Sequence, residues 1–194
     1  ASVAKEKGLL PLADIIYAQE DIGKTPKEIA SEFINSELGV ETAEDALQGA
    51  MDIIAEKISD DADIRKRMRF VCSAHGIINV KSSVEDAGVY EMYADYSEAV
   101  SKIPDHRILA INRGEKENIL KVNIEFDKQK AMFVISKNHI KEGSVFTELV
   151  VRAAEDAYSR LIFPAVEREI RSSLTERASD NAIKVFSTNL KQLL

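Results

Sequence analysis

The chain has 194 residues and a mass of 21.6 kDa, and 45% of its residues are hydrophobic and 30% charged, which excludes an intrinsically disordered chain. No apolar run approaches the roughly 18 residues that a membrane helix needs, and the single cysteine, Cys72, excludes a disulfide framework or a multi-cysteine zinc site. The net charge of −7 is concentrated in residues 1–60, which carry five basic and thirteen acidic side chains and are therefore unlike a dedicated nucleic-acid-binding domain.

Residues 1–76 read as a helical subdomain. Apolar residues at helical spacing predict a first helix over residues 9–19. A capping box at Thr25-Pro26-Lys27-Glu28 predicts a second helix from Pro26, and Thr42 precedes an amphipathic helix that continues to Ile58. A fourth helix is expected over about residues 62–75. It follows a short turn, so the last two helices of this subdomain are a possible helix-turn-helix.

Residues 77–143 read as a mixed segment. A short strand is expected at residues 77–80, a short helix over residues 105–112, and a strand over residues 120–126, where apolar and polar side chains alternate. The apolar run at residues 131–135 is compatible with a hairpin partner for that strand or with the start of a helix, since short apolar runs do not distinguish the two.

Residues 144–194 are expected to be helical and to pack back on the first part of the chain. Ser144 can cap a helix, which Pro164 should kink or interrupt because proline lacks a backbone donor. A final helix from about Asp180 is expected to bury a stripe of four residues: Ile183, Phe186, Leu190 and Leu193. The fold class is therefore mainly α, a multi-helix scaffold with a small β element around residues 77–135.

No pattern in the chain predicts an enzyme, and we expect no metal site and no cofactor. His75, His106 and His139 are far apart, and no Gly-rich phosphate loop or nucleophile motif occurs. Cys72 and His75, three apart on one helix, fit a buried thiol and a helix-end imidazole better than a shared metal. For His106, a structural role beside Pro104 and Asp105 is favoured over acid–base chemistry.

Four basic residues crowd one side of the expected 62–75 helix: Arg65, Lys66, Arg67 and Arg69. They could contact phosphates, but a solvated face partly neutralised by nearby aspartates is the simpler interpretation. Tyr90, Tyr93 and Tyr96 could stack on bases, although packing on the core or on another domain is favoured.

Several motifs in order along the whole chain resemble the helical middle of the Tex-like transcription accessory proteins. In the first half they are Lys7-Gly-Leu-Leu-Pro-Leu-Ala-Asp14, Gly49-Ala-Met-Asp-Ile-Ile-Ala-Glu56, Tyr96-Ser-Glu98, Ile103-Pro-Asp-His-Arg107 and Arg113-Gly-Glu115. In the second half they are Glu155-Asp-Ala-Tyr158 through Pro164, Glu167-Arg-Glu169, Ala182-Ile-Lys-Val-Phe186 and Asn189-Leu190. The segment from Glu117 to Gly143 is the least similar to the family.

The resemblance implies a scaffold in a bacterial, cytoplasmic protein that binds RNA or DNA and acts in transcription or RNA metabolism. It also implies that the chain is a fragment, whose natural neighbours are a ribonuclease-H-like domain, helix-hairpin-helix modules and an OB-fold RNA-binding domain downstream. These downstream domains and the transcription machinery are the expected protein partners, with no membrane involved. The predicted nucleic-acid contacts are Arg65, Lys66, Arg69, Arg107 and Arg113. The alternative is a protein-interaction module that docks onto the transcription machinery without touching nucleic acid.

Overall fold

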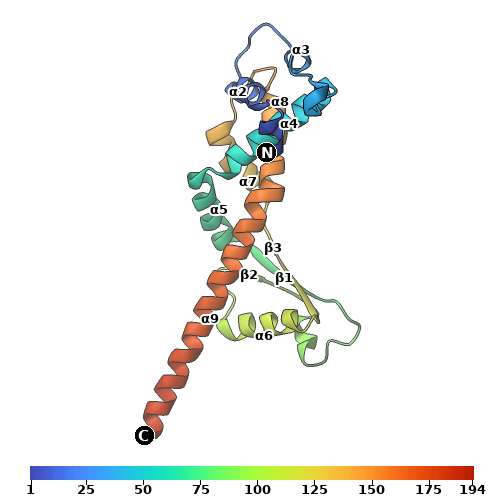
Figure 1. Ribbon diagram of the computed structural model, residues 1–194. Helices are drawn as coiled ribbons and strands as arrows, with labels where there is room; N and C mark the ends of the chain where they lie inside the picture. The colour runs from blue at the N-terminus through green and yellow to red at the C-terminus, as the bar shows by residue number, and fades with distance from the viewer. The chain divides into compact units, whose positions relative to one another are not determined.

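The computed structural model describes all residues from 1 to 194 and confirms a mainly helical fold with one small antiparallel sheet (Figure 1). Two compact units make up the chain, and each takes two separate segments. Unit 1 contains Ala1–Arg67 and Lys128–Pro164, and unit 2 contains Met68–Asp127 and Ala165–Leu194. The division expected at residues 76 and 143 followed changes in the residue pattern along the sequence. The two units instead group residues that contact one another in the folded chain.

The first helices of unit 1 are α1 (Ser2–Glu6), α2 (Leu10–Ala18), α3 (Pro26–Ser31), the 3₁₀ turn η1 (Ser36–Leu38) and α4 (Ala43–Ser59). Two of them, α3 and α4, begin at the expected threonines. The Thr25 hydroxyl accepts a hydrogen bond from the Glu28 amide, and the Thr42 hydroxyl accepts one from the Asp45 amide. Each bond satisfies a donor that a helix start leaves open, so both predicted N-caps are confirmed.

Helix α4 forms the centre of unit 1. It packs against α1, α2, α3 and α8 (Thr147–Asp156). Its buried side consists mainly of small and branched apolar residues. The helix that faces it, α8, is also rich in alanine. The side chains of α4 that are buried are Ala43, Ala46, Ala50, Ile53, Ile54, Ala55, Ile58 and Ser59. Alanines at these positions allow close helix packing, while the isoleucines supply most of the buried apolar area.

The ambiguous apolar run at residues 131–135 is helical. It lies within α7 (Lys128–His139), where Ala131 and Ile135 are buried four positions apart. The strand before it therefore needs another partner, and it pairs with the first strand of the chain instead.

The α8 helix passes into a short π-helix, η3 (Ala157–Ile162), directly before α9 (Phe163–Leu193). Pro164 is the second residue of α9 and follows the π-helical turn directly. The predicted interruption at Pro164 thus takes the form of a π-helical turn just upstream of the proline. The separate helix expected from Asp180 is wrong, because α9 is one uninterrupted helix of 31 residues.

Unit 2 contains the sheet, in the order β2-β1-β3, with both pairs antiparallel. Its strands are β1 (Ile77–Ser82), β2 (Asp95–Ala99) and β3 (Leu120–Glu125). Ile78 and Val80 of β1 are buried, and Ile78 lies opposite Ile124 of β3. The alternation of β3 was clear in the sequence, whereas β2 was not predicted because Asp95-Tyr96-Ser97-Glu98-Ala99 is polar on both faces.

Helix α5 (Ala62–His75) ends at Gly76, and the chain turns directly into β1. A Cβ at Gly76 would lie 2.4 Å from the Cys72 carbonyl oxygen, so no other residue fits there without a backbone shift. Helix α6 (Asp105–Lys116) packs on β3 and on the 3₁₀ segment η2 (Gly88–Tyr93). Gly114 of α6 permits this approach, because a Cβ there would lie 2.5 Å from Leu120 Cδ1.

The last turns of α9 are exposed. Its first part buries Val166, Ile170, Leu174 and Ala178. The stripe expected to be buried is not, since Ile183 is 67% exposed, Phe186 69%, Leu190 48% and Leu193 84%. Helical spacing identified the apolar stripe, but no residue of the described chain covers it. None of the helices combines the length and the apolarity needed to cross a bilayer.

Candidate nucleic-acid interface

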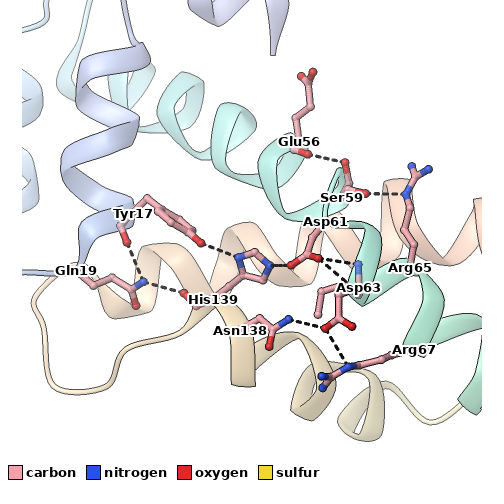
Figure 2. Close-up of polar contacts among 11 residues, drawn as sticks. Tyr17, Gln19, Glu56, Ser59, Asp61, Asp63, Arg65, Arg67, Asn138 and His139 are labelled. Carbon is pink, nitrogen blue, oxygen red and sulfur yellow. Dashed lines mark hydrogen bonds and ion pairs between the residues drawn. The ribbon is translucent and has the colours of Figure 1, made fainter.

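Arg65 and Lys66 lie on the exposed side of α5 within unit 1. Arg65 Nε donates a 2.7 Å hydrogen bond to the carbonyl oxygen of Ser59, the last residue of α4 (Figure 2). This bond satisfies a carbonyl that the helix end leaves open, so Arg65 acts as a C-terminal cap. Lys66 makes no hydrogen bond and no ion pair, and its ammonium group is free for an external anion.

Arg67 belongs to a small polar chain rather than to a free basic face. Its Nε lies 3.0 Å from Asp63 Oδ2, which also accepts a 3.1 Å hydrogen bond from Asn138 Nδ2 of α7 (Figure 2). The pair of Arg67 and Asp63 is half-exposed and spaced i, i+4, so it stabilises α5 only modestly. The neutralisation of the basic side by aspartates, expected from the sequence, is thus present at Arg67.

Arg69 lies in unit 2, beside a groove of about 260 Å³. Its Nε is 3.2 Å from Glu169 Oε2 of α9. Two of the groove's lining residues are arginines, Arg69 and Arg177, and three are serines, Ser73, Ser101 and Ser173. The serine hydroxyls make no hydrogen bond within the chain, so they are available to a ligand.

Arg177 is held rigidly at the edge of this groove. Its Nε donates to Asp105 Oδ1 at 2.8 Å and its Nη2 to the Ile103 carbonyl at 2.8 Å. The hydrogen bond from Asn181, together with the neighbouring Arg177, lowers the pKa of Asp105. Asp105 therefore stays ionised and fixes the guanidinium in place through Nε, while Nη1 makes no hydrogen bond within the chain. Guanidinium and hydroxyl donors around one hollow are suited to a tetrahedral anion such as phosphate.

Phe70, next to Arg69, was not singled out in the sequence and is 75% exposed. Its exposed ring is a platform on which a base can stack. The sequence contained a sign of this exposure, because Phe70 lies outside the apolar stripe of α5 that includes Ile64, Met68 and Cys72.

Arg107 has a different environment from the other predicted contacts. Its Nη1 bonds to Glu98 Oε2 at 3.2 Å and to the Tyr96 hydroxyl, and its guanidinium lies over the Tyr96 ring. The hydrogen bond with Glu98 raises the pKa of Arg107. The side chain thus joins α6 to β2, and its buried Nε has no hydrogen-bond partner. Arg113, also on α6, is exposed and lies outside the groove of Arg69.

Two of the three clustered tyrosines belong to the core of unit 2. Tyr90 and Tyr93 are each 4% exposed, and Tyr96 packs edge-on against Tyr93 while its hydroxyl donates to Glu98. They pack inside the unit, as favoured from the sequence. Cys72 is also buried, and desolvation raises the pKa of its thiol to about 12.

A buried polar network in unit 1 carried no recognisable sequence signal. Tyr17, Asp61 and His139 come from three distant parts of the chain and meet side by side (Figure 2). The Tyr17 hydroxyl is 2.8 Å from His139 Nδ1, and His139 Nε2 is 2.8 Å from Asp61 Oδ2. Gln19, in a left-handed conformation at the end of α2, donates to the His139 carbonyl and accepts from the Lys141 amide.

Comparisons with known proteins cover the whole chain. Residues 21–186 match a family model described as Tex central region-like. The chain is 44% identical to YdcI of Bacillus subtilis over 202 residues, covering 100% of this chain and 28% of YdcI. It is 30% identical to the protein tex of Bordetella pertussis over 211 residues, covering 100% of this chain and 26% of that protein.

A human protein named S1 RNA-binding domain-containing protein 1 is 32% identical over 173 residues, covering 80% of this chain and 17% of that protein. The chain thus spans about a quarter of the length of the bacterial relatives and less of the human one.

Proposed function

Because the chain belongs to the Tex family, as its central region, we propose that it is a helical scaffold of a transcription accessory protein and that it contacts nucleic acid directly. The observation that carries the second part is the groove of unit 2, where Arg69 and Arg177 flank three unpaired serine hydroxyls. Phe70, which follows Arg69 in the sequence, is exposed. The name of the human relative includes RNA binding, which supports RNA as the ligand to test first.

The groove is suited to backbone recognition rather than to base readout. Two guanidinium groups and three hydroxyls supply donors for one or two phosphates, while Phe70 can stack on any base. Both arginines already pair with carboxylates, so the local positive charge is modest. We therefore expect weak binding without sequence preference.

Lys66 adds a free cation on α5. The helices α4 and α5 follow one another through a turn at Asp60 and Asp61, which supports the helix-turn-helix interpretation of the sequence. In that interpretation, Lys66 contacts a phosphate while Arg65 keeps its capping role at the end of α4. The proposal includes a cytoplasmic location and no catalytic activity.

Binding of the purified chain to a fluorescent single-stranded RNA and to a duplex DNA tests the proposal. With about three phosphate contacts, affinity should fall roughly 20-fold to 40-fold between 50 and 200 mM salt. Replacing Arg69→Gln together with Phe70→Ala should weaken binding at 50 mM salt by about tenfold or more. Glutamine retains a donor toward Glu169, so unit 2 should remain folded.

Lys184→Gln, at an exposed and unpartnered position of α9, is the matched control and should bind like the unmodified chain. No binding at 50 mM salt would overturn direct contact with nucleic acid. An equal loss in the control and in the Arg69 and Phe70 variant would also overturn the assignment to this groove.

A further inference from the structure

A groove of about 470 Å³ opens in unit 1 beside the packed helices α2 and α4. Its floor is apolar, with Ala13, Ile53 and Ile54 buried and Leu10 43% exposed. Leu10, Ala13, Asp14 and Tyr17 line it from one face of α2, since they are spaced by three or four positions. An apolar hollow of this size with a few polar groups around it is the usual form of a binding site.

The wall of the groove is rigid and aromatic. His139 Nε2 donates to Asp61 Oδ2, and His139 Nδ1 lies 2.8 Å from the Tyr17 hydroxyl, which holds the tyrosine ring in place (Figure 2). Burial raises the pKa of Tyr17, which therefore remains a donor. The Nζ of Lys57 lies 4.1 Å from the centre of the Tyr17 ring, so this ring already accepts a cation on its face.

The rim of the groove is acidic. Four carboxylates line it against two ammonium groups, which belong to Lys5 and Lys57. Two of these carboxylates, those of Asp14 and Asp60, are exposed and make no hydrogen bond or ion pair within the chain. Such a rim attracts a cation and repels a phosphate, so the groove does not fit the backbone of a nucleic acid.

We propose that this groove binds a basic peptide segment of a partner protein through an arginine. The aliphatic stem of the arginine lies on Leu10 and Ala13, and its guanidinium pairs with Asp14 and Asp60. Arginine fits better than lysine, because its planar group forms two parallel bonds to a carboxylate. This site is independent of the nucleic-acid contact proposed for unit 2.

Fluorescence anisotropy with a labelled twelve-residue peptide of arginine and leucine tests the proposal on the full chain. The comparison peptide carries citrulline in place of arginine, which keeps the shape and removes the charge. We expect the arginine peptide to bind at least tenfold more tightly. We also expect the double substitution Asp14→Asn and Asp60→Asn to weaken its binding by tenfold or more, without unfolding, since both side chains are exposed and unpartnered.

A control variant removes the same charge elsewhere in unit 1, with Asp21→Asn and Glu37→Gln, and should bind the peptide normally. Leu10→Ser should weaken binding of both peptides, because it removes the exposed apolar contact. Equal affinity for the two peptides, no binding at all, or an equal loss in the control would overturn the proposal. The Arg69 and Phe70 variant should bind the peptide normally, so this proposal and the nucleic-acid proposal fail separately.

Discussion

Asp61 connects two parts of unit 1 through its two carboxylate oxygens. Oδ1 accepts hydrogen bonds from the Asp63 amide at 3.0 Å and from the Ile64 amide at 3.3 Å, which caps the start of α5. Oδ2 accepts the bond from His139 at the end of α7. Burial raises the pKa of Asp61, but the bonds from the Ile64 amide, His139 and the Asp63 amide outweigh it, and the pKa falls below its ordinary value of 3.8.

This lowered pKa predicts how stability depends on pH. The folded chain binds the Asp61 proton less readily than the unfolded chain, so the stabilisation by ionised Asp61 is present above about pH 4 and is lost as the pH falls further. Asp61→Asn keeps a capping oxygen and removes the titration. Urea midpoints at pH 5 and pH 3 should therefore fall less for this variant than for the unmodified chain. Asp21→Asn, at an exposed and unpartnered carboxyl, should show the full decrease, and an identical decrease in all three proteins would contradict the prediction.

At the residue scale, the sequence identified residues that can cap a nearby helix, but it did not identify contacts between distant residues. The capping roles of Thr25 and Thr42 depend on neighbours three positions away, and both were predictable. His139 is different, because its partners Tyr17 and Asp61 are 122 and 78 positions away in the sequence. No local pattern contains a contact over such a distance, so only the folded chain reveals the network.

At the element scale, α9 contains two different halves. Up to Ala178, the helix buries one residue in about every four, whereas all residues from Asp180 onward are exposed. The apolar stripe runs the full length, with Phe186 and Leu190 continuing the spacing of Ile170 and Leu174. Amphipathic spacing predicts a helix and identifies its apolar side, but it does not say whether anything covers that side.

This difference predicts unequal effects of substitutions along α9. Ile170→Ala removes a side chain that is 4% exposed, and it should lower the free energy of unfolding by about 2–4 kcal/mol. Phe186→Glu changes a side chain that is 69% exposed, and it should change this free energy by less than about 0.5 kcal/mol. Urea unfolding followed by far-UV circular dichroism measures both. A loss of several kcal/mol in the Phe186 variant would mean that the stripe is covered in solution.

At the scale of the whole molecule, each compact unit combines an early segment with a later one. The Tyr17, Asp61 and His139 network joins the early and late segments of unit 1. In unit 2, Arg171 joins the two segments through a 2.8 Å bond to Glu115, and Glu167 does so by accepting from the Ile124 amide at 2.7 Å. Damage to one network should therefore loosen one unit more than the other.

Hydrogen exchange of a His139→Gln variant tests this expectation. The substitution disturbs two partly buried hydrogen bonds and should lower the local stability of unit 1 by about 1–3 kcal/mol. Amides of α2 and α7 should exchange faster, while those of β1 and β3 should be unchanged. His106→Gln, at an exposed imidazole, is the control and should exchange like the unmodified chain. A uniform increase across the sheet and the helices would show instead that both units unfold together.

By itself, the sequence determined the mainly helical class, most helix starts and the alternation of β3, because these depend on caps and periodicity within a few residues. It also carried the ordered motifs of the Tex family. Only the tertiary structure decided that residues 131–135 are helical, that β3 pairs with β1, and that the basic residues of α5 differ in their partners. The tertiary structure also forms the two candidate binding grooves. Each of these depends on contacts between residues far apart in the chain, whose free energy exceeds the local preferences that a sequence pattern records.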